Sequence, residues 1–198
     1  MKKNFISIIL FLIFTTQTFS HGGHLENSSI LEYELFRNNK LIGFHNYSFE
    51  TNANDTVVKS IIEFKIKKLG IDLYKYEATS LEKYEKGQLV NFSSKTNQNN
   101  KIKNTQINFN EKKNLLIISG SENQITSPKE YPVGTWWNHE IVQAKAQISA
   151  ISGRIIEQKV TFLGKEKLNL YGKTYYALRF NFTSSDKNLA DNKKVLKP

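Results

Sequence analysis

The chain contains no cysteine. This absence excludes disulfide bonds, thiolate metal sites, iron–sulfur clusters and cysteine nucleophiles. Proline and glycine are also sparse, with 3 and 10 residues in a chain of 198, which excludes collagen-like and proline-rich segments. The hydrophobic fraction of 39% is too high for a wholly disordered chain, and the length fits one domain or two small ones.

Arginine is scarce although the chain is basic. The formal net charge is +10, yet Arg37, Arg154 and Arg179 are the only arginines among the 28 basic residues. Arginine is the usual choice for bidentate recognition of phosphates and bases, whereas lysine is a solvated point charge. We therefore expect the lysines to cover an ordinary surface, and we expect no nucleic-acid partner.

A long apolar run occurs only at the N-terminus. Two lysines precede Phe5 to Phe14, a run of ten residues broken only by Ser7. Such a run is too short to span a bilayer comfortably but matches the hydrophobic region of a signal peptide. Thr18 and Ser20 suit the positions before a cleavage site, so we expect cleavage after Ser20, export to the bacterial periplasm, and no transmembrane segment in the mature protein.

Composition divides the chain into four segments. Residues 1–20 are the expected signal peptide, and residues 21–28 form a flexible mature N-terminus. Residues 29–184 carry the β-rich pattern of a single domain. Residues 185–198 are polar and lack a hairpin pattern, so we expect either a disordered tail or a truncated chain.

The dominant period from Ile30 onward is two. Between Val58 and Ile66, mostly apolar residues alternate with mostly charged ones, which indicates a half-buried antiparallel strand. Similar runs cover residues 30–37, 41–50, 73–84, 89–96, 101–109, 115–119, 154–163, 166–170 and 174–183. The links between them are short and rich in Asn and Gly, which favour tight hairpins, so sequential strands should pair as neighbours.

A meander of this many strands curls because strands twist relative to one another. The sequence therefore predicts an all-β, mainly antiparallel fold: a strongly curved sheet or incomplete β-barrel with one short helix. The helix is expected within residues 141–151, where apolar residues follow helical spacing. Trp136 and Trp137 precede it, and this segment either plugs the open side of the sheet or forms an aromatic platform for a ligand.

Several aromatic and polar side chains should face the concave side of the sheet. His45 is in phase with Tyr47, and Tyr74 shares a face with Tyr76. His45 is then either a hydrogen-bonded core histidine or a polar anchor inside a binding cavity. The candidate ligand-binding residues are His45, Tyr47, Tyr74, Tyr76, Trp136 and Trp137.

Catalytic motifs are missing from the sequence. No nucleophile elbow, Walker loop or dinucleotide fingerprint is present, so we assign no catalytic residues and expect no cofactor. The alternative is an enzyme acting on cell-envelope material, with His45 as the acid–base residue and Tyr74 or Glu77 nearby. That alternative requires His45 and Glu77 to converge in an open cleft.

The expected mature N-terminus reads His21-Gly22-Gly23-His24. A free α-amine beside an imidazole can chelate a divalent transition metal, and Cu²⁺ most strongly. His21 and His24 are therefore candidate copper ligands. The other interpretation is a frayed terminus in which these histidines are incidental.

Three segments resemble a family of bacterial exported proteins of unknown function. They are residues 31–50, with the I-G-x-H element at Ile42, Gly43 and His45; residues 70–100, with Y-x-Y-E and G-x-L-V elements; and the TWWN loop at residues 135–138. The resemblance implies a β-rich domain of the cell envelope and supplies no catalytic residue. The closing W-Y-D hairpin of the family is not found after Thr183.

These observations lead to one functional expectation. The chain is an exported periplasmic β-domain without enzymatic activity, which binds a hydrophobic or cell-envelope ligand in a concave sheet. The alternatives are the envelope-acting enzyme that uses His45 and the copper-binding protein that uses His21 and His24.

The N-terminal sequence of the protein purified from its producing cell tests both the export and the copper predictions. We expect it to begin at His21, and copper titration should then reveal one tight site if His21 and His24 are ligands. A chain that still begins at Met1 would contradict export. A correctly processed chain without a tight Cu²⁺ site would leave export intact and remove the copper alternative.

Overall fold

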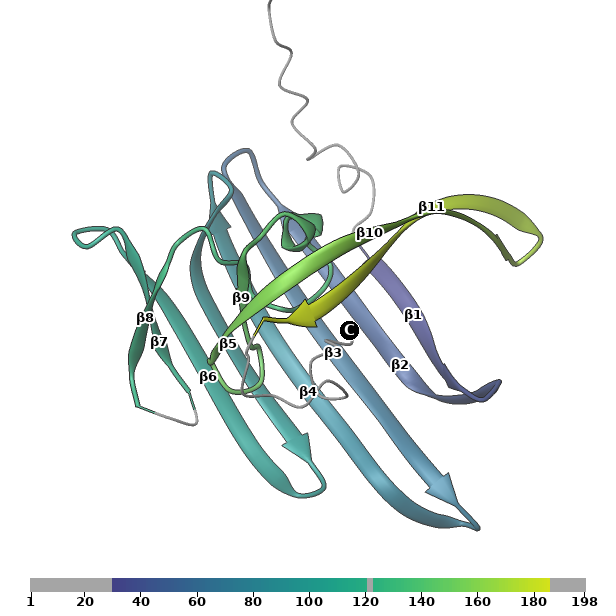
Figure 1. Cartoon of the computed structure of the whole chain (residues 1–198). Helices are drawn as coiled ribbons and strands as arrows, with labels where there is room; N and C mark the ends of the chain where they lie inside the picture. The colour runs from purple at the N-terminus through teal and green to yellow at the C-terminus, as the bar shows by residue number, and fades with distance from the viewer. Residues whose placement is uncertain (1–29, 121–122, 186–198) are drawn as a thin grey trace, which may run out of the picture.

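The computed structural model describes residues 30–120 and 123–185. The expected cleavage site, the candidate copper ligands His21 and His24, and the tail after residue 185 lie outside the described residues. Eight strands form one antiparallel sheet in which each strand pairs with the next one along the chain (Figure 1). They are β1 (Ile30–Arg37), β2 (Lys40–Thr51), β3 (Asp55–Lys68), β4 (Ile71–Glu85), β5 (Gln88–Gln98), β6 (Lys101–Asn110), β7 (Leu115–Ser119) and β8 (Ile125–Pro128).

Two-residue turns set the register of the long hairpins. Both central residues have positive φ at Asn38-Asn39, Lys86-Gly87 and Asn99-Asn100, as the turns that suit twisted strands require. The β3–β4 turn, Leu69-Gly70, has the same geometry with φ of 52° and 80°. Leucine rarely adopts positive φ, so the sequence did not mark this turn.

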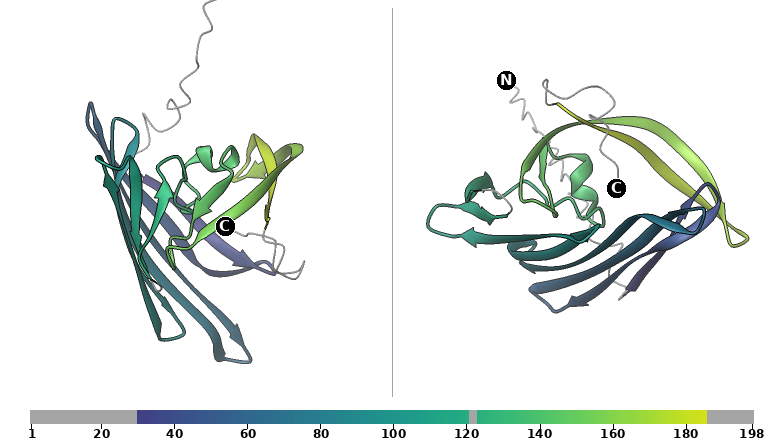
Figure 2. Two further views of the ribbon diagram at one scale, coloured as in Figure 1. Left: turned by 60° about the vertical axis from the view of Figure 1, so that its left-hand side comes forward. Right: turned by 90° about the horizontal axis from the view of Figure 1, so that it is seen from below.

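A second sheet lies over the concave face of the first (Figure 2). It contains β9 (Ala146–Ile148), β10 (Ile155–Leu170) and β11 (Lys173–Ser184), with β10 in the centre. The β10–β11 hairpin, here called the strap, arches across the open side of the eight-stranded sheet. The register shifts beside Gly164, whose φ is +122°, and such a bulge bends the hairpin. The two runs expected at 154–163 and 166–170 are thus one bulged strand.

The expected all-β architecture is confirmed, and the large sheet is not closed into a barrel. The expected helix within residues 141–151 is wrong in extent. A single 3₁₀ turn covers His139–Val142, while Ala146–Ile148 pairs with Ile155–Glu157 as a strand. The apolar residues with helical spacing are buried or half-buried here without forming a helix. Ala146–Ile148 pairs with β10 and is completely buried, and this tertiary pairing outweighs the local preference for a helix.

The core lies between the concave face of the large sheet and residues 129–154, here called the plug segment. One cluster packs Phe92, Ile107 and Leu116 of the sheet against Val133 and Ile148 of the plug segment. A second cluster, of Tyr47, Phe49 and Val58, packs against Trp137. The plug segment is therefore a structural part of the core, as one of the two interpretations of this region expected.

Gly43 of the I-G-x-H element allows β2 and β3 to approach closely. A Cβ atom at Gly43 would collide with the carbonyl oxygen of Glu63 and lie 2.6 Å from the Cα atom of Phe64. Both of these atoms belong to the backbone, so neither can move without shifting β3. Gly43 therefore permits the close approach of β2 to β3 two residues before His45, which pairs with Ile62 of β3.

We expect Gly43→Ala to destabilise the fold by about 1–3 kcal/mol, because an added methyl group must displace the backbone of β3. Urea denaturation followed by circular dichroism measures this loss. A variant as stable as the wild type would contradict the close approach.

Candidate functional site

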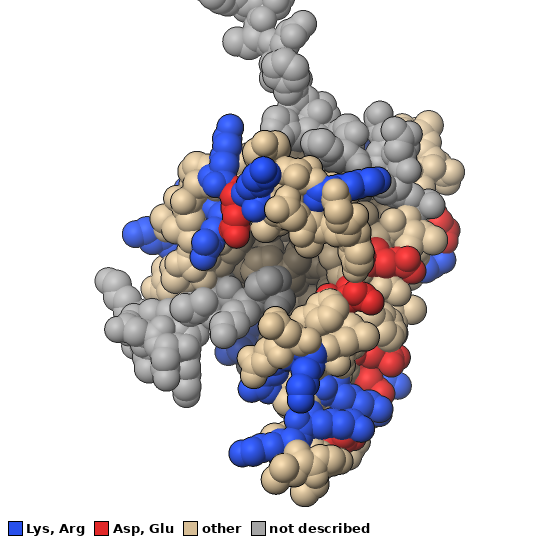
Figure 3. Space-filling view, turned by 90° about the vertical axis from the view of Figure 1, so that its right-hand side faces the viewer, with Lys and Arg blue, Asp and Glu red and all other residues tan. Residues whose placement is uncertain are grey.

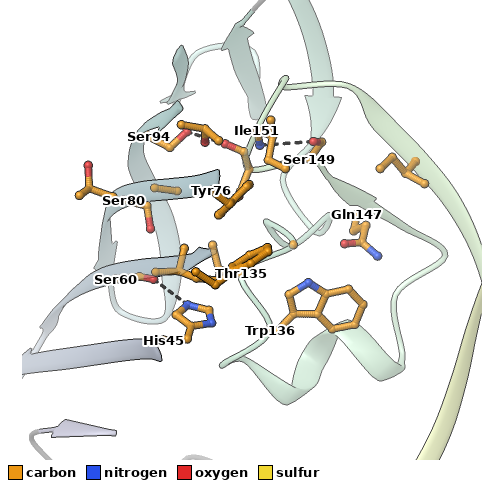
Figure 4. Close-up of a pocket in the computed structure, with 18 of the residues that line it drawn as sticks. His45, Ser60, Tyr76, Ser80, Ser94, Thr135, Trp136, Gln147, Ser149 and Ile151 are labelled. Carbon is orange, nitrogen blue, oxygen red and sulfur yellow. Dashed lines mark hydrogen bonds between the residues drawn. The ribbon is translucent and has the colours of Figure 1, made fainter. Parts of the chain in front are cut away.

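A cavity of about 410 Å³ lies between the concave face and the plug segment (Figure 4). The sheet contributes His45, Ser60, Ile62, Phe64, Tyr74, Tyr76, Ala78, Thr79, Ser80, Ser94 and Thr96. The plug segment and the start of β10 contribute Gly134, Thr135, Trp136, Gln147, Ser149, Ala150, Ile151 and Ile156. The volume falls within the range of about 300–1,000 Å³ that is usual for small-molecule sites.

Aromatic rings form much of the cavity wall. The ring of Phe64 on β3 lies 5.1 Å from that of Tyr76 in a stacked arrangement and 5.7 Å from that of Tyr74. Trp136 lies on the plug side, and its ring meets Phe182 of the strap edge-on at 5.1 Å. The strap therefore holds one aromatic wall in place, while strand pairing holds the other.

His45 and Ser60 supply a polar corner of the same cavity (Figure 4). Nε2 of His45 lies 2.9 Å from Oγ of Ser60, and the imidazole packs on the ring of Tyr47 at 4.3 Å. Burial lowers the pKa of His45 to about 4. The imidazole is consequently neutral near pH 7, where it can donate one hydrogen bond and accept another.

Glu82, which is not among the candidate residues predicted from the sequence, is a buried carboxyl group beneath the plug segment. Nε1 of Trp137 donates a hydrogen bond of 2.8 Å to Oε1 of Glu82, and the hydroxyl of Tyr84 donates one of 2.6 Å to Oε2. Burial raises the pKa of Glu82, while hydrogen bonds from Tyr84, Trp137 and Thr135 oppose that rise. Glu82 is six residues after Tyr76 on the same strand, so the period of two places both side chains on the same face. This is the sequence signal that indicates a buried position for Glu82.

Two further hydrogen bonds attach the plug segment to the concave face. The hydroxyl of Tyr47 donates a hydrogen bond to the carbonyl oxygen of Thr135, and the hydroxyl of Ser94 donates one to the carbonyl oxygen of Ala150. Together with Trp137 on Glu82, they fix both stretches of the plug segment that line the cavity. The cavity therefore has a roof that is anchored at three points.

The structure brings four of the six candidate ligand-binding residues to the cavity: His45, Tyr74, Tyr76 and Trp136. Tyr47 and Trp137 instead join the sheet to the plug segment: Tyr47 of β2 donates to the carbonyl oxygen of Thr135, and Trp137 of the plug segment donates to Glu82 of β4. Within the described ranges 30–120 and 123–185, no group of three or more His, Asp or Glu side chains is arranged to hold a metal ion.

The arrangement that an enzyme using His45 and Glu77 would need is not formed. Tyr76 and Ala78 line the cavity, so Glu77 points to the other face of β4, where it pairs with Lys75 and accepts a hydrogen bond from Asn97.

The His45–Ser60 distance does suit a base and a nucleophile. However, Ser60 lies within a central strand, in register with Tyr47 on β2 and Ser80 on β4, so its backbone is engaged in the sheet rather than in an oxyanion hole. A histidine with a pKa of about 4 is also a weak base. This pair is better suited to hydrogen bonding than to proton abstraction.

Fold and site together define an open, curved antiparallel sheet with a ligand-sized cavity under a plug. Residues 33–195 match the family model described as a domain of unknown function, DUF6134. The chain belongs to this family. No curated protein and no solved structure matches the chain. In the described part of the chain, no helix is long and apolar enough to cross a membrane.

The buried carboxyl group of Glu82 predicts a pH-dependent difference between the wild type and Glu82→Gln. Because burial raises the pKa of Glu82 above its ordinary value of 4.5, the folded state favours the protonated form, and wild-type stability declines as pH rises through that raised pKa. The variant carries a neutral amide at this position and escapes the decline. The free energy of unfolding of Glu82→Gln relative to the wild type should therefore increase from pH 5 to pH 8.

Urea denaturation at a series of pH values measures this difference, and the titration of His45 is common to both proteins. Glu85→Gln, at an exposed position of the same strand, is the matched control and should follow the wild type. Parallel stability curves for the wild type and Glu82→Gln would contradict the prediction.

Proposed function

We propose that this chain is an exported, periplasmic, non-enzymatic protein that binds a hydrophobic small molecule in the cavity. The observation that carries the proposal is the chemistry of the wall. None of the described residues that line it is Asp, Glu, Lys or Arg, although the chain as a whole carries a net charge of +10. A wall of this kind favours an uncharged ligand, because an unpaired charge is costly to bury.

The cavity offers an apolar surface with polar groups at its edges. The apolar part of the ligand lies between the Phe64–Tyr76 pair on the sheet and Trp136 on the plug segment. His45 with Ser60 supplies hydrogen-bonding groups at one side, and Gln147 with Ser149 supplies them at another (Figure 4). This combination suits an amphipathic molecule with a ring or a short acyl chain and one or two uncharged polar groups.

Access to the cavity does not require unfolding. The space-filling view shows a hollow between the strap and the sheet (Figure 3). The plug segment stays anchored through Tyr47, Glu82 and Ser94 while a ligand enters beside it. Binding then requires little rearrangement of the backbone, which limits the entropic cost of association.

Export is supported by the N-terminal pattern of two lysines, ten mainly apolar residues and a small-residue cleavage site. A domain without cysteine is compatible with an oxidising compartment, because its stability does not depend on disulfides and it carries no thiol that could be oxidised. A ligand from the cell envelope is consistent with that location.

Filling the cavity tests the proposal. N-phenyl-1-naphthylamine, an uncharged aromatic probe that fluoresces in apolar surroundings, should bind the wild type saturably. Ala78→Phe puts a ring into the cavity and should weaken binding of the probe by about tenfold or more, since it removes space and apolar contacts.

Lys83→Phe adds the same ring at an exposed position of the same strand and should bind the probe as the wild type does. Circular dichroism establishes that both variants are folded. Equal affinity of the wild type and folded Ala78→Phe would overturn the proposal.

A further inference from the structure

Three hairpin turns of the large sheet share an unusual composition. Because the strands are antiparallel and consecutive, the β1–β2, β3–β4 and β5–β6 turns lie at the same end of the sheet (Figure 1). The β3–β4 turn projects furthest. Residues 36–41, 67–73 and 98–103, which form these turns and their flanks, are called here the basic-apolar end.

Large apolar side chains are exposed in all three turns. Leu69 is 93% exposed and Ile71 67%, both in the β3–β4 turn, and Ile102 beside the β5–β6 turn is 59% exposed. Phe36 and Leu41 flank the β1–β2 turn and are each 59% exposed. Hairpin turns are normally polar, and apolar side chains gathered on one surface mark an interaction site.

Basic side chains surround these apolar ones. The three ranges contain six Lys and Arg residues and one acid, Asp72, which gives a net charge of +5. Asp72 lies 3.4 Å from Lys67, so the other five basic groups set the local field. Blue side chains gather near the lower end of the molecule in the space-filling view (Figure 3).

The opposite end of the same sheet differs. Its turns, within residues 51–56, 85–88 and 110–115, have a net charge of zero. No large exposed apolar side chain of the described chain falls in these three ranges. If the charge and the apolar side chains came only from a general abundance of lysine and isoleucine in the chain, both ends would have them. The composition of the basic-apolar end is therefore a specific property of that surface.

We propose that the basic-apolar end docks on the surface of an anionic lipid bilayer. Leu69 and Ile71 enter the boundary between headgroups and acyl chains, while the surrounding Lys and Arg side chains bind anionic headgroups. Charge complementarity alone would also suit a nucleic acid. The exposed apolar turns distinguish the two, because duplex phosphates offer such side chains no apolar environment.

Docking would place the cavity close to the lipid. Tyr74, which lines the cavity, follows Leu69 by five residues, or roughly 16 Å along an extended strand. The inference does not depend on ligand binding, however, since it rests on side chains outside the cavity.

Sedimentation with vesicles tests the proposal. Protein is purified as the producing cell processes it, and its intact mass is measured so that any retained N-terminal residues are the same in every variant. The vesicles are phosphatidylcholine alone or phosphatidylcholine mixed with phosphatidylglycerol. The wild type should bind the anionic vesicles selectively, and added salt should weaken this binding.

Two triple variants remove the same charge from opposite ends of the sheet. Lys40→Gln, Lys68→Gln and Lys101→Gln together should weaken binding to anionic vesicles by about tenfold or more. Lys86→Gln, Lys112→Gln and Lys113→Gln together should change it less than about twofold, because the screened field of these distant lysines barely reaches the bilayer. Leu69→Ser with Ile71→Ser should weaken binding while leaving the net charge unchanged.

Several results would overturn the proposal. They are no selective binding of the wild type to anionic vesicles, equal effects of the two triple variants, or no effect of Leu69→Ser with Ile71→Ser. A wild type that binds duplex DNA through the same lysines, and not the vesicles, would favour a nucleic-acid partner instead. All substituted positions are exposed, and circular dichroism establishes that each variant is folded.

Discussion

The buried carboxyl group of Glu82 is the constraint on which the rest of the site depends. A polar group without solvent must be hydrogen-bonded to be tolerated, and Glu82 is fully buried at the centre of the concave face. Tyr84 on the same strand supplies one donor, and Trp137 of the plug segment supplies another. The plug segment therefore has to lie where Trp137 reaches Glu82.

The hydrogen bond between Trp137 and Glu82 also positions the neighbouring residue, Trp136. While Trp137 points to Glu82, Trp136 adopts a φ of +69° and lines the cavity against Phe182 of the strap. Two adjacent residues of the same type thus have different roles, one attaching the roof and one forming the wall. The hydrogen bonds from Tyr47 to Thr135 and from Ser94 to Ala150 hold the flanking backbone, so contacts within the fold set the shape of the cavity.

Much of the fold could be predicted from the sequence because strand alternation and turn chemistry are local signals. The period of two placed His45, Tyr74 and Tyr76 on the inner face, and Asn-rich links marked most hairpins. The Leu69-Gly70 turn was missed because leucine is an unusual residue for that backbone. The helix expected within residues 141–151 was wrong in extent, because pairing of Ala146–Ile148 with β10 is a tertiary effect that local spacing does not carry.

The roles of the aromatic residues were harder to predict than their positions. His45, Tyr74, Tyr76 and Trp136 meet at one cavity, whereas Tyr47 and Trp137 hold the plug segment. Their orientation depends on Glu82 and on the carbonyl of Thr135, and these partners lie 55 residues from Trp137 and 88 residues from Tyr47 along the chain. Whether residues so far apart along the chain meet depends on how the plug segment crosses the sheet, and a single sequence does not specify that crossing.

The proposed occupant of the cavity under the plug segment is a hydrophobic small molecule. Native mass spectrometry can detect this occupant on the intact protein. The protein is purified without detergent from the cell that makes it and is then incubated with a total lipid extract of that cell. We expect a small-molecule adduct on the wild type that is lost on denaturation. A folded wild type that carries no adduct and gains none from the extract would contradict it.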